Sequence, residues 1–203
     1  MAHTLTVKGA ATRQRIIEGA AAEIRERGVL ATTLDDVRAR TGTSKSQLFH
    51  YFPDGKEELL LAVARYEADQ VLADQEPQLS TLTSWDAWTA WREKVLAHYR
   101  KQGQSCPLNM LMTQLGRSTP GARAVVLELL RQWQGELAAG ISHMQRLGEI
   151  GAHLDPDRTA AALVAAVQGG AGVMMSTGVT THLEAALDLG LRFLRDSANR
   201  GRS

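Results

Sequence analysis

Residues 33–52, TLDDVRARTGTSKSQLFHYF, decide the fold, because they have the pattern of two short helices joined by a tight turn. The first helix ends at Thr41-Gly42, and Gly42 suits the left-handed backbone that such a turn requires. Ser44 precedes Gln47 by three residues, which matches the capping box that begins a second helix. The stretch therefore predicts a helix-turn-helix.

The second of these helices has an apolar and a polar side. Leu48 and Phe52, four residues apart, are predicted to face inward. The side chains left to face outward are Thr43, Lys45, Ser46, Gln47, His50 and Tyr51. A short polar helix adds little to a core, but it suits the phosphates and base edges of a DNA major groove. The alternative is an ordinary solvated helix face.

The residue types on that face suit different DNA contacts. Gln47 can pair bidentately with adenine, and Lys45 can reach guanine or a phosphate. We expect His50 and Tyr51 to contact phosphate or sugar. Ser44 is a further candidate, although we expect it to act mainly as a cap.

Thr33 and Lys56 stand at predicted helix starts, where backbone N–H groups and the helix dipole favour an anion. Each is a candidate for a phosphate that flanks the readout helix. For Thr33 a simple N-cap is equally compatible, and one Thr can fill both roles. Lys8 and Arg13 are expected in or beside a flexible N-terminal segment that adds phosphate or minor-groove contacts, although a solvated tail is the simpler interpretation for Lys8.

The composition is that of a soluble globular protein. The chain has 203 residues, of which 44% are hydrophobic, and this is enough to form a core. The single Cys106 excludes an internal disulfide and suits a reducing cytoplasm. We expect neither secretion nor membrane insertion, because no signal-like or membrane-length apolar run is present. The net charge is +1, and residues 1–56 carry nine Lys/Arg against six Asp/Glu, an excess of the sign that DNA requires.

Nearly the whole chain has helical periodicity, and the prediction is an all-α fold of nine helices. The expected helices are 12–27, 33–41, 44–52, 56–75, 85–101, 108–115, 120–148, 156–177 and 181–198. Thr119-Pro120 and Asp155-Pro156 each predict an N-cap followed by proline in the first turn. We expect a three-helix DNA-binding domain at 1–55 and a six-helix ligand-binding and dimerisation domain at 56–203.

The segment 12–61 resembles the TetR/AcrR family of transcriptional regulators. The residues that carry the resemblance are TRQRIIEGA at 12–20, Gly28 before Thr32-Thr33-Leu34, Val37, Gly42, Ser44-Lys45, LFHYF at 48–52 and KEEL at 56–59. YFPDGKEEL at 51–59 and Cys106-Pro107-Leu108 are similar to the LmrA/YxaF-like multidrug- and flavonoid-responsive subgroup. The chain departs from that subgroup at Ser105 and Asn109, where glycine is usual.

The resemblance implies that the last two helices form a four-helix interface with a second copy. The candidate interface residues are Ala161, Ala165, Gly169, Ala186, Leu189 and Phe193. A dimer is also needed mechanically, because one short readout helix covers too few base pairs for useful specificity. The alternative is that these small residues pack helices closely within one chain.

Aromatic and thioether side chains in the C-terminal part predict a ligand pocket, since they suit irregular and promiscuous sites. The candidates are Trp85, Trp88, Tyr99, Met110, Met112, Trp133, His143, Met144, Gln168 and Met174. The alternative for any one of them is plain core. No carboxylate stands out inside an apolar run, so we expect a neutral aromatic or amphipathic ligand.

The sequence predicts no enzyme and no cofactor, because it has no metal-ligand spacing, phosphate loop, dinucleotide motif or nucleophile elbow. Cys106 is expected to be a small hydrophobe rather than a redox sensor. The expected function is a cytoplasmic homodimeric repressor that binds a short palindromic operator and is released by a small inducer. The alternatives are an activator, a ligand-independent regulator, or a helical ligand-binding protein or enzyme with a vestigial helix-turn-helix.

Overall fold

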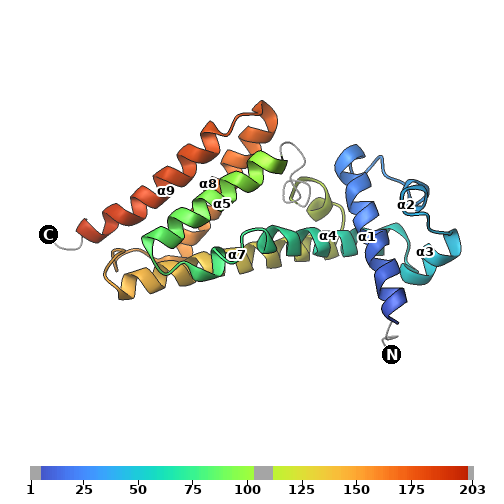
Figure 1. Cartoon of the computed structure of the whole chain (residues 1–203), viewed down its shortest axis with the longest axis horizontal. Coiled ribbons are helices and arrows are strands. Elements are labelled where there is room, and N and C mark those ends of the chain that lie inside the picture. The colour runs from blue at the N-terminus through green and yellow to red at the C-terminus, as the bar shows by residue number, and fades with distance from the viewer. Residues whose placement is uncertain (1–5, 103–111, 201–203) are drawn as a thin grey trace. The chain divides into compact units, whose positions relative to one another are not determined.

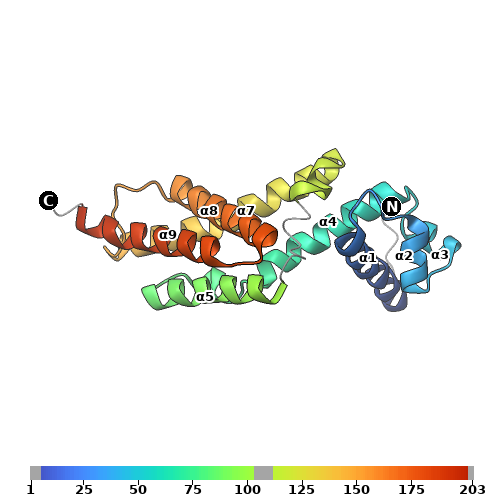
Figure 2. The same cartoon turned by 90° about the horizontal axis from the view of Figure 1, so that it is seen from above.

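The computed structural model describes residues 6–102 and 112–200, and all regular elements in these ranges are helical (Figures 1 and 2). The α-helices are α1 (Val7–Arg27), α2 (Leu34–Thr41), α3 (Lys45–Tyr51), α4 (Lys56–Ala73), α5 (Trp85–Gln102), α7 (Pro120–Arg146), α8 (Pro156–Thr177) and α9 (Thr181–Arg200). Two short 3-10 helices, η1 (Leu79–Thr81) and η2 (Leu115–Arg117), lie between them. The all-α prediction is confirmed. Half of the helix expected at 108–115, residues 108–111, falls outside the described residues.

The chain divides into two compact units. Unit 1 comprises the described residues of Met1–Gln70 and Pro107–Leu127, and unit 2 comprises those of Val71–Cys106 and Glu128–Ser203. Helices α4 and α7 therefore each contribute residues to both units. The domain boundary at residue 55 that the sequence predicts is drawn between two expected functions, and it does not coincide with the boundary between these compact units. The assignment of the two functions to 1–55 and 56–203 stays a prediction.

Helix α1 begins five residues earlier than the sequence pattern indicates. The Thr6 side chain caps it by accepting the Gly9 N–H at 3.1 Å, and the helix then runs to Arg27. Lys8 therefore lies in the first turn of α1, and the expectation of a flexible tail at that position is wrong. The first two turns contain Gly9 and small alanines, and their one large apolar residue, Val7, is 91% exposed, so the hydrophobic pattern gives only a weak helix signal there.

Helices α1 and α2 of unit 1 approach each other closely. A Cβ atom placed on Gly19 would lie 2.2 Å from Cγ2 of Thr41, so only glycine leaves room for the end of α2. The buried apolar residues beneath the three N-terminal helices include Ile16, Ile17, Ala20, Ile24, Val37, Leu48 and Phe52. This shared core fixes α2 and α3 on α1.

Helices α8 and α9 of unit 2 pack along each other (Figure 2). A Cβ atom on Gly170 would lie 2.6 Å from the Leu183 Cα, and one on Gly190 would lie 2.5 Å from Leu163 Cδ2. Both glycines therefore serve close packing within the chain. By length and composition α8 is the one described helix that could cross a membrane, but seven of its residues are buried, as in a core helix.

Proline-bearing caps begin α7 and α8 as the sequence predicted. The Ala122 N–H donates to Thr119 Oγ1 at 3.1 Å, and the Arg158 N–H donates to Asp155 Oδ1 at 3.1 Å. Each cap satisfies a backbone donor that would otherwise have no partner at the start of the helix. These local signals therefore determine where the two long helices of the body begin.

Candidate nucleic-acid interface

Both predicted capping boxes of the helix-turn-helix are present. The Asp36 N–H donates to Thr33 Oγ1 at 3.2 Å, and the Thr33 N–H donates to Asp36 Oδ2 at 2.9 Å. The Gln47 N–H donates to Ser44 Oγ at 3.1 Å, and the Ser44 N–H donates to Gln47 Oε1 at 3.2 Å. Gly42 between the helices has a φ of 61°, as expected. Thr33 and Ser44 are therefore caps, and their roles toward DNA stay predictions.

Most of the polar side of α3 is open to solvent. Lys45, Ser46, Gln47 and His50 are exposed, whereas Tyr51 is half-buried. The capping box holds the Gln47 amide at the N-terminal end of α3, which is the end that a readout helix presents to base edges. The arrangement therefore suits contact with DNA.

Thr43 does not face outward, and that expectation is wrong. Only 4% of the residue is exposed, and its Oγ1 accepts a hydrogen bond from Thr41 Oγ1 at 2.8 Å. Its backbone N–H donates to the Arg38 carbonyl at 3.1 Å. Thr43 is occupied in closing the turn after Gly42, while Leu48 and Phe52 are fully buried as predicted.

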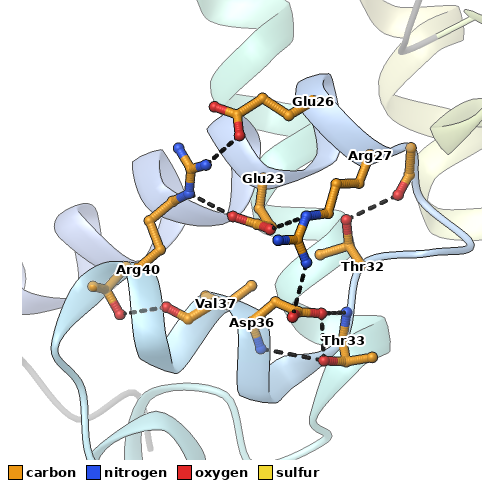
Figure 3. Close-up of polar contacts among 10 residues, drawn as sticks. Glu23, Glu26, Arg27, Thr32, Thr33, Asp36, Val37 and Arg40 are labelled. Atoms are coloured by element: carbon orange, nitrogen blue, oxygen red, sulfur yellow. Dashed lines mark hydrogen bonds and ion pairs between the residues drawn. The ribbon is translucent and has the colours of Figure 1, made fainter.

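A network of ion pairs joins α1 to α2 (Figure 3). The Glu23 carboxylate, whose side chain is 4% exposed, pairs with Arg27 at 2.8 Å and with Arg40. Arg40 also pairs with Glu26, and Arg27 with Asp36 at 3.0 Å. The carboxylates of Glu26 and Glu23 raise the pKa of Arg40. The network compensates the buried charge of Glu23. It also holds α2 against α1, and therefore positions the turn that leads from α2 into α3.

The loop after α1 is held at Val29 from two sides. The Val29 N–H donates to Gln114 Oε1 at 2.9 Å, and the Val29 carbonyl accepts from Lys56 Nζ at 3.0 Å. A hollow of about 460 Å³ lies beside this loop, with Arg27 and Arg117 among its lining residues. The Lys56 ammonium thus already has a protein partner, and its contact with phosphate stays a prediction.

A buried carboxylate lies in unit 1, where the sequence pattern gives no sign of one. Glu67 on α4 is fully buried and forms an ion pair with Arg25 on α1. Because Arg25 compensates its charge, Glu67 gives no reason to expect a cationic ligand.

The predicted ligand-contacting residues have different surroundings. Trp88, Tyr99, Trp133, Met144 and Met174 are buried in unit 2, while His143, Gln168 and, in unit 1, Met112 are half-buried. Met110 and Cys106 lie outside the described residues.

Trp85 lies nearer the surface of unit 2. Its indole N–H donates to Glu149 Oε2 at 3.0 Å, and the Arg195 guanidinium lies 4.8 Å from the centroid of its ring. These contacts account for Trp85 without a ligand. A ligand role for this residue has no further support from its surroundings.

The outer side of α8 and α9 carries an apolar surface. Ala161, Ala165 and Gly169 are exposed on α8, and on α9 Leu189 is 67% and Phe193 45% exposed. A groove of about 740 Å³ runs here, lined by residues that include Leu154, Ala162, Ala166, Ala186, Leu189 and Phe193. The small residues of these two helices therefore lie on two faces. Ala161, Ala165 and Gly169 lie on the solvent-exposed face of α8, whereas Gly170 and Gly190 lie where α8 and α9 pack together inside the chain.

Comparison with known families identifies both parts of the chain. Residues 16–63 match the model of bacterial regulatory proteins of the tetR family. Residues 82–189 match a tetracyclin repressor-like C-terminal domain. Together the two matches include the helix-turn-helix and most of the helical body.

The relatives are transcriptional regulators. The HTH-type regulator Rv0196 of Mycobacterium tuberculosis is 31% identical over 105 residues, which are 51% of this chain and 53% of Rv0196. The chain thus spans about half the length of that relative. YxaF of Bacillus subtilis is 24% identical over 131 residues, which cover 63% of this chain and 68% of YxaF. This match agrees with the resemblance to the YxaF-like subgroup.

A solved structure supports the fold. The SmeT–triclosan complex superposes with a TM-score of 0.73 over 93% of this chain and 94% of that chain, at 20% identity. The capped helix-turn-helix, the helical body and the two family matches lead to one conclusion. The chain belongs to the TetR family of transcriptional regulators.

Proposed function

We propose that this protein is a cytoplasmic homodimeric repressor that binds a short palindromic operator and leaves it when a small aromatic or amphipathic inducer fills the body. The observation that carries this proposal is the exposed polar face of α3, with Lys45, Ser46, Gln47 and His50 on a helix that is capped at its start and buried on its other side. Such a face has little use in packing and a clear use against base edges.

The apolar groove on α8 and α9 supports the dimer. Leu189 and Phe193 are large apolar side chains left in solvent, and exposed apolar patches on soluble proteins commonly mark interfaces. Two copies related by a two-fold axis would present two α3 helices to inverted half-sites. A palindromic operator follows from that symmetry.

The aromatic interior of unit 2 supports the inducer, and SmeT, which shares the fold, is named in complex with triclosan. Induction requires a ligand that binds better to a conformation in which the two α3 helices are wrongly spaced, since only differential affinity shifts the equilibrium. Helix α4 is the natural element to carry the change, because it contributes residues to both units.

Selection from a random DNA pool tests the proposal and requires no assumption about the operator sequence. The wild type is expected to enrich two inverted copies of one short half-site. The double variant Lys45→Ala, Gln47→Ala is expected to enrich nothing, whereas Lys101→Ala, which removes an exposed cation from α5, should enrich the same site. Failure of the wild type to enrich any sequence would refute the proposal and favour a ligand-binding protein with a vestigial helix-turn-helix.

The direction of regulation is tested separately. We expect the operator to overlap the promoter that it controls, since a bound dimer there excludes the polymerase. A site upstream of the promoter, together with higher transcription when the protein is bound, would identify an activator instead.

A further inference from the structure

The hollow beside Val29 has no role in the function proposed above. This Val29 hollow has a volume of about 460 Å³, which falls within the range of small-molecule sites, about 300–1,000 Å³. Residues 27–31, at the end of α1 and in the loop that follows, form one wall. Residues 113, 114, 117 and 118, in and beside η2, form the other. Both walls belong to unit 1, so the hollow lies within one compact body.

The two walls of the Val29 hollow are tied together. The Val29 N–H donates to Gln114 Oε1 at 2.9 Å, and a Cβ atom on Gly28 would lie 3.3 Å from the same oxygen. Gly28 also has a φ of 83°, which side-chain-bearing residues rarely adopt. The hydrogen bond and the glycine together set the distance between the walls. A ligand that enters such a preformed site does not have to order the walls first.

The Val29 hollow carries positive charge that the chain does not balance locally. Arg27 shares its charge with two carboxylates of α1 and α2, but Arg117 forms no ion pair with a carboxylate in the part of the chain that the structure describes. Arg117 also lines a neighbouring hollow of about 380 Å³ together with Arg123. The described lining residues of the two hollows include three arginines and neither Asp nor Glu. An anion is therefore attracted to this surface.

The loop wall of the Val29 hollow also presents an apolar surface. Leu30 is 97% exposed, which makes it the most exposed large apolar side chain among the described residues. Ala31 beside it is exposed as well, and both residues line the hollow. A single exposed leucine is common on protein surfaces, but here it borders a hollow that two guanidinium groups also line. This combination suits a ligand that has an apolar part and an anionic group.

We propose that the Val29 hollow binds a small amphipathic carboxylate, with its anionic group on Arg117 and Arg27 and its apolar part against Leu30. A guanidinium group suits a carboxylate because it can donate two parallel hydrogen bonds to it. This site lies in unit 1, whereas the inducer proposed above binds in unit 2, so the inference goes beyond the proposed function. A ligand in the hollow contacts both segments that the hydrogen bond between Val29 and Gln114 joins, and it therefore stabilises the loop that leads into α2.

Matched acids and amides test this inference, because an amide keeps the shape of the acid and lacks its charge. The probes are octanoate and octanamide, cinnamate and cinnamamide, and naphthoate and naphthamide. Each is titrated into ¹⁵N-labelled full-length protein, and dissociation constants are taken from the backbone amide signals of Gly28, Leu30 and Ser118. At least one acid should bind saturably and about fivefold tighter than its amide, as expected for an ion pair that stays partly in solvent. High salt should weaken the acid and leave the amide unchanged.

Variants locate the site. In Arg117→Gln the preference for the acid should fall below about twofold while the amide still binds, because the side chain keeps hydrogen-bond donors and loses its charge. Leu30→Ser should weaken the acid and the amide by similar factors, since both share the apolar part. Arg65→Gln is the matched control and should keep the preference, because Arg65 is an exposed arginine of unit 1 that does not line the hollow. All three positions are exposed, and unchanged signals from unit 2 report that each variant is folded.

Three outcomes would overturn the inference: no acid binds saturably, acids and amides bind equally, or the preference for the acid survives in Arg117→Gln. The first is expected if Arg117 is an ordinary solvated side chain. The last is expected if the acids bind only in the interior of unit 2, where the indole signal of Trp88 would then move instead of the backbone signal of Leu30. The assay contains no DNA, so its failure leaves the operator proposal standing. Conversely, acid binding at Leu30 without operator binding would refute only the repressor function.

Discussion

The side-chain amide oxygen of Gln114 accepts the backbone N–H of Val29 at 2.9 Å, across 85 positions of sequence. On its other side Val29 is held by Lys56, at the start of the helix that follows the helix-turn-helix. The segment that leads from α1 into α2 is therefore fixed by two residues from outside the first three helices. The position of α2 in unit 1 depends on both.

Gln114→Ala should weaken unit 1. Val29 is 6% exposed, so the substitution leaves a buried N–H unpaired, which costs about 1–2 kcal/mol. The free energy of unfolding is measured in urea. Gln132→Ala is the control, because Gln132 is exposed and its amide donates to Glu128 one turn earlier on the same helix, and it should change stability by less than about 0.5 kcal/mol. Equal effects of the two substitutions would contradict the role given to Gln114.

Gly19→Val should separate α1 from α2. The new side chain would overlap Thr41 Cγ2, which lies 2.2 Å from the Cβ position, and overpacking of this kind costs about 1–3 kcal/mol. We expect lower thermal stability and loss of operator binding. Gly135→Ala on α7 meets no atom within 4 Å and should be neutral or stabilising by about 0.5–1 kcal/mol. A Gly19→Val protein as stable as wild type would show that the helices are not tightly packed.

Leu189→Glu, Phe193→Glu should produce a monomer. Burying two carboxylates in an apolar interface carries a large desolvation cost, while in the free chain both positions are already exposed. Light scattering after size exclusion should give twice the chain mass, 22.1 kDa, for wild type and the single mass for the variant. Leu127→Glu, at a 58% exposed site on α7, should remain dimeric. A dimer that persists in the double variant would move the interface elsewhere.

His98 should make unit 2 sensitive to mild acid. Burial lowers the pKa of His98 below its usual 6.5, although Asp74, 3.3 Å away, favours the charged form and opposes the shift, while Lys101 and Lys94 reinforce it. The folded state therefore binds the proton less readily than the unfolded state. The contribution to stability is complete above pH 6.5 and is lost as the pH falls through the lower, folded-state pKa.

Melting temperatures at pH 7 and pH 5 check this linkage. The decrease between the two should be smaller in His98→Gln than in wild type. His182→Gln, an exposed position at the start of α9, should behave like wild type. An unchanged decrease in His98→Gln would show that other groups govern the acid response.

The features that could be predicted from the sequence are local. The capping boxes at Thr33 and Ser44, the left-handed Gly42 and the buried pair Leu48 and Phe52 are all set by residues within four positions of one another. Short-range patterns of this kind determine the local backbone conformation themselves, so their prediction does not depend on how distant segments pack.

The features that could not be predicted depend on contacts between distant segments. Glu67 has the sequence signature of a solvated helix position, and its pairing with Arg25, 42 positions away, compensates its buried charge. Gln114 carries no signal of its role at Val29. Thr43 lies in the turn, one residue before the cap of α3, where the helical spacing that predicts an outward side chain does not yet apply.

The most direct test of the repressor account is fluorescence anisotropy of the purified protein on DNA fragments that flank its own gene, with random DNA as the reference and at two salt concentrations. Under the repressor hypothesis we expect saturable binding, with two chains per site and about a thousandfold preference over random DNA. Weak binding that is equal on both DNAs and disappears as the salt concentration rises would contradict it.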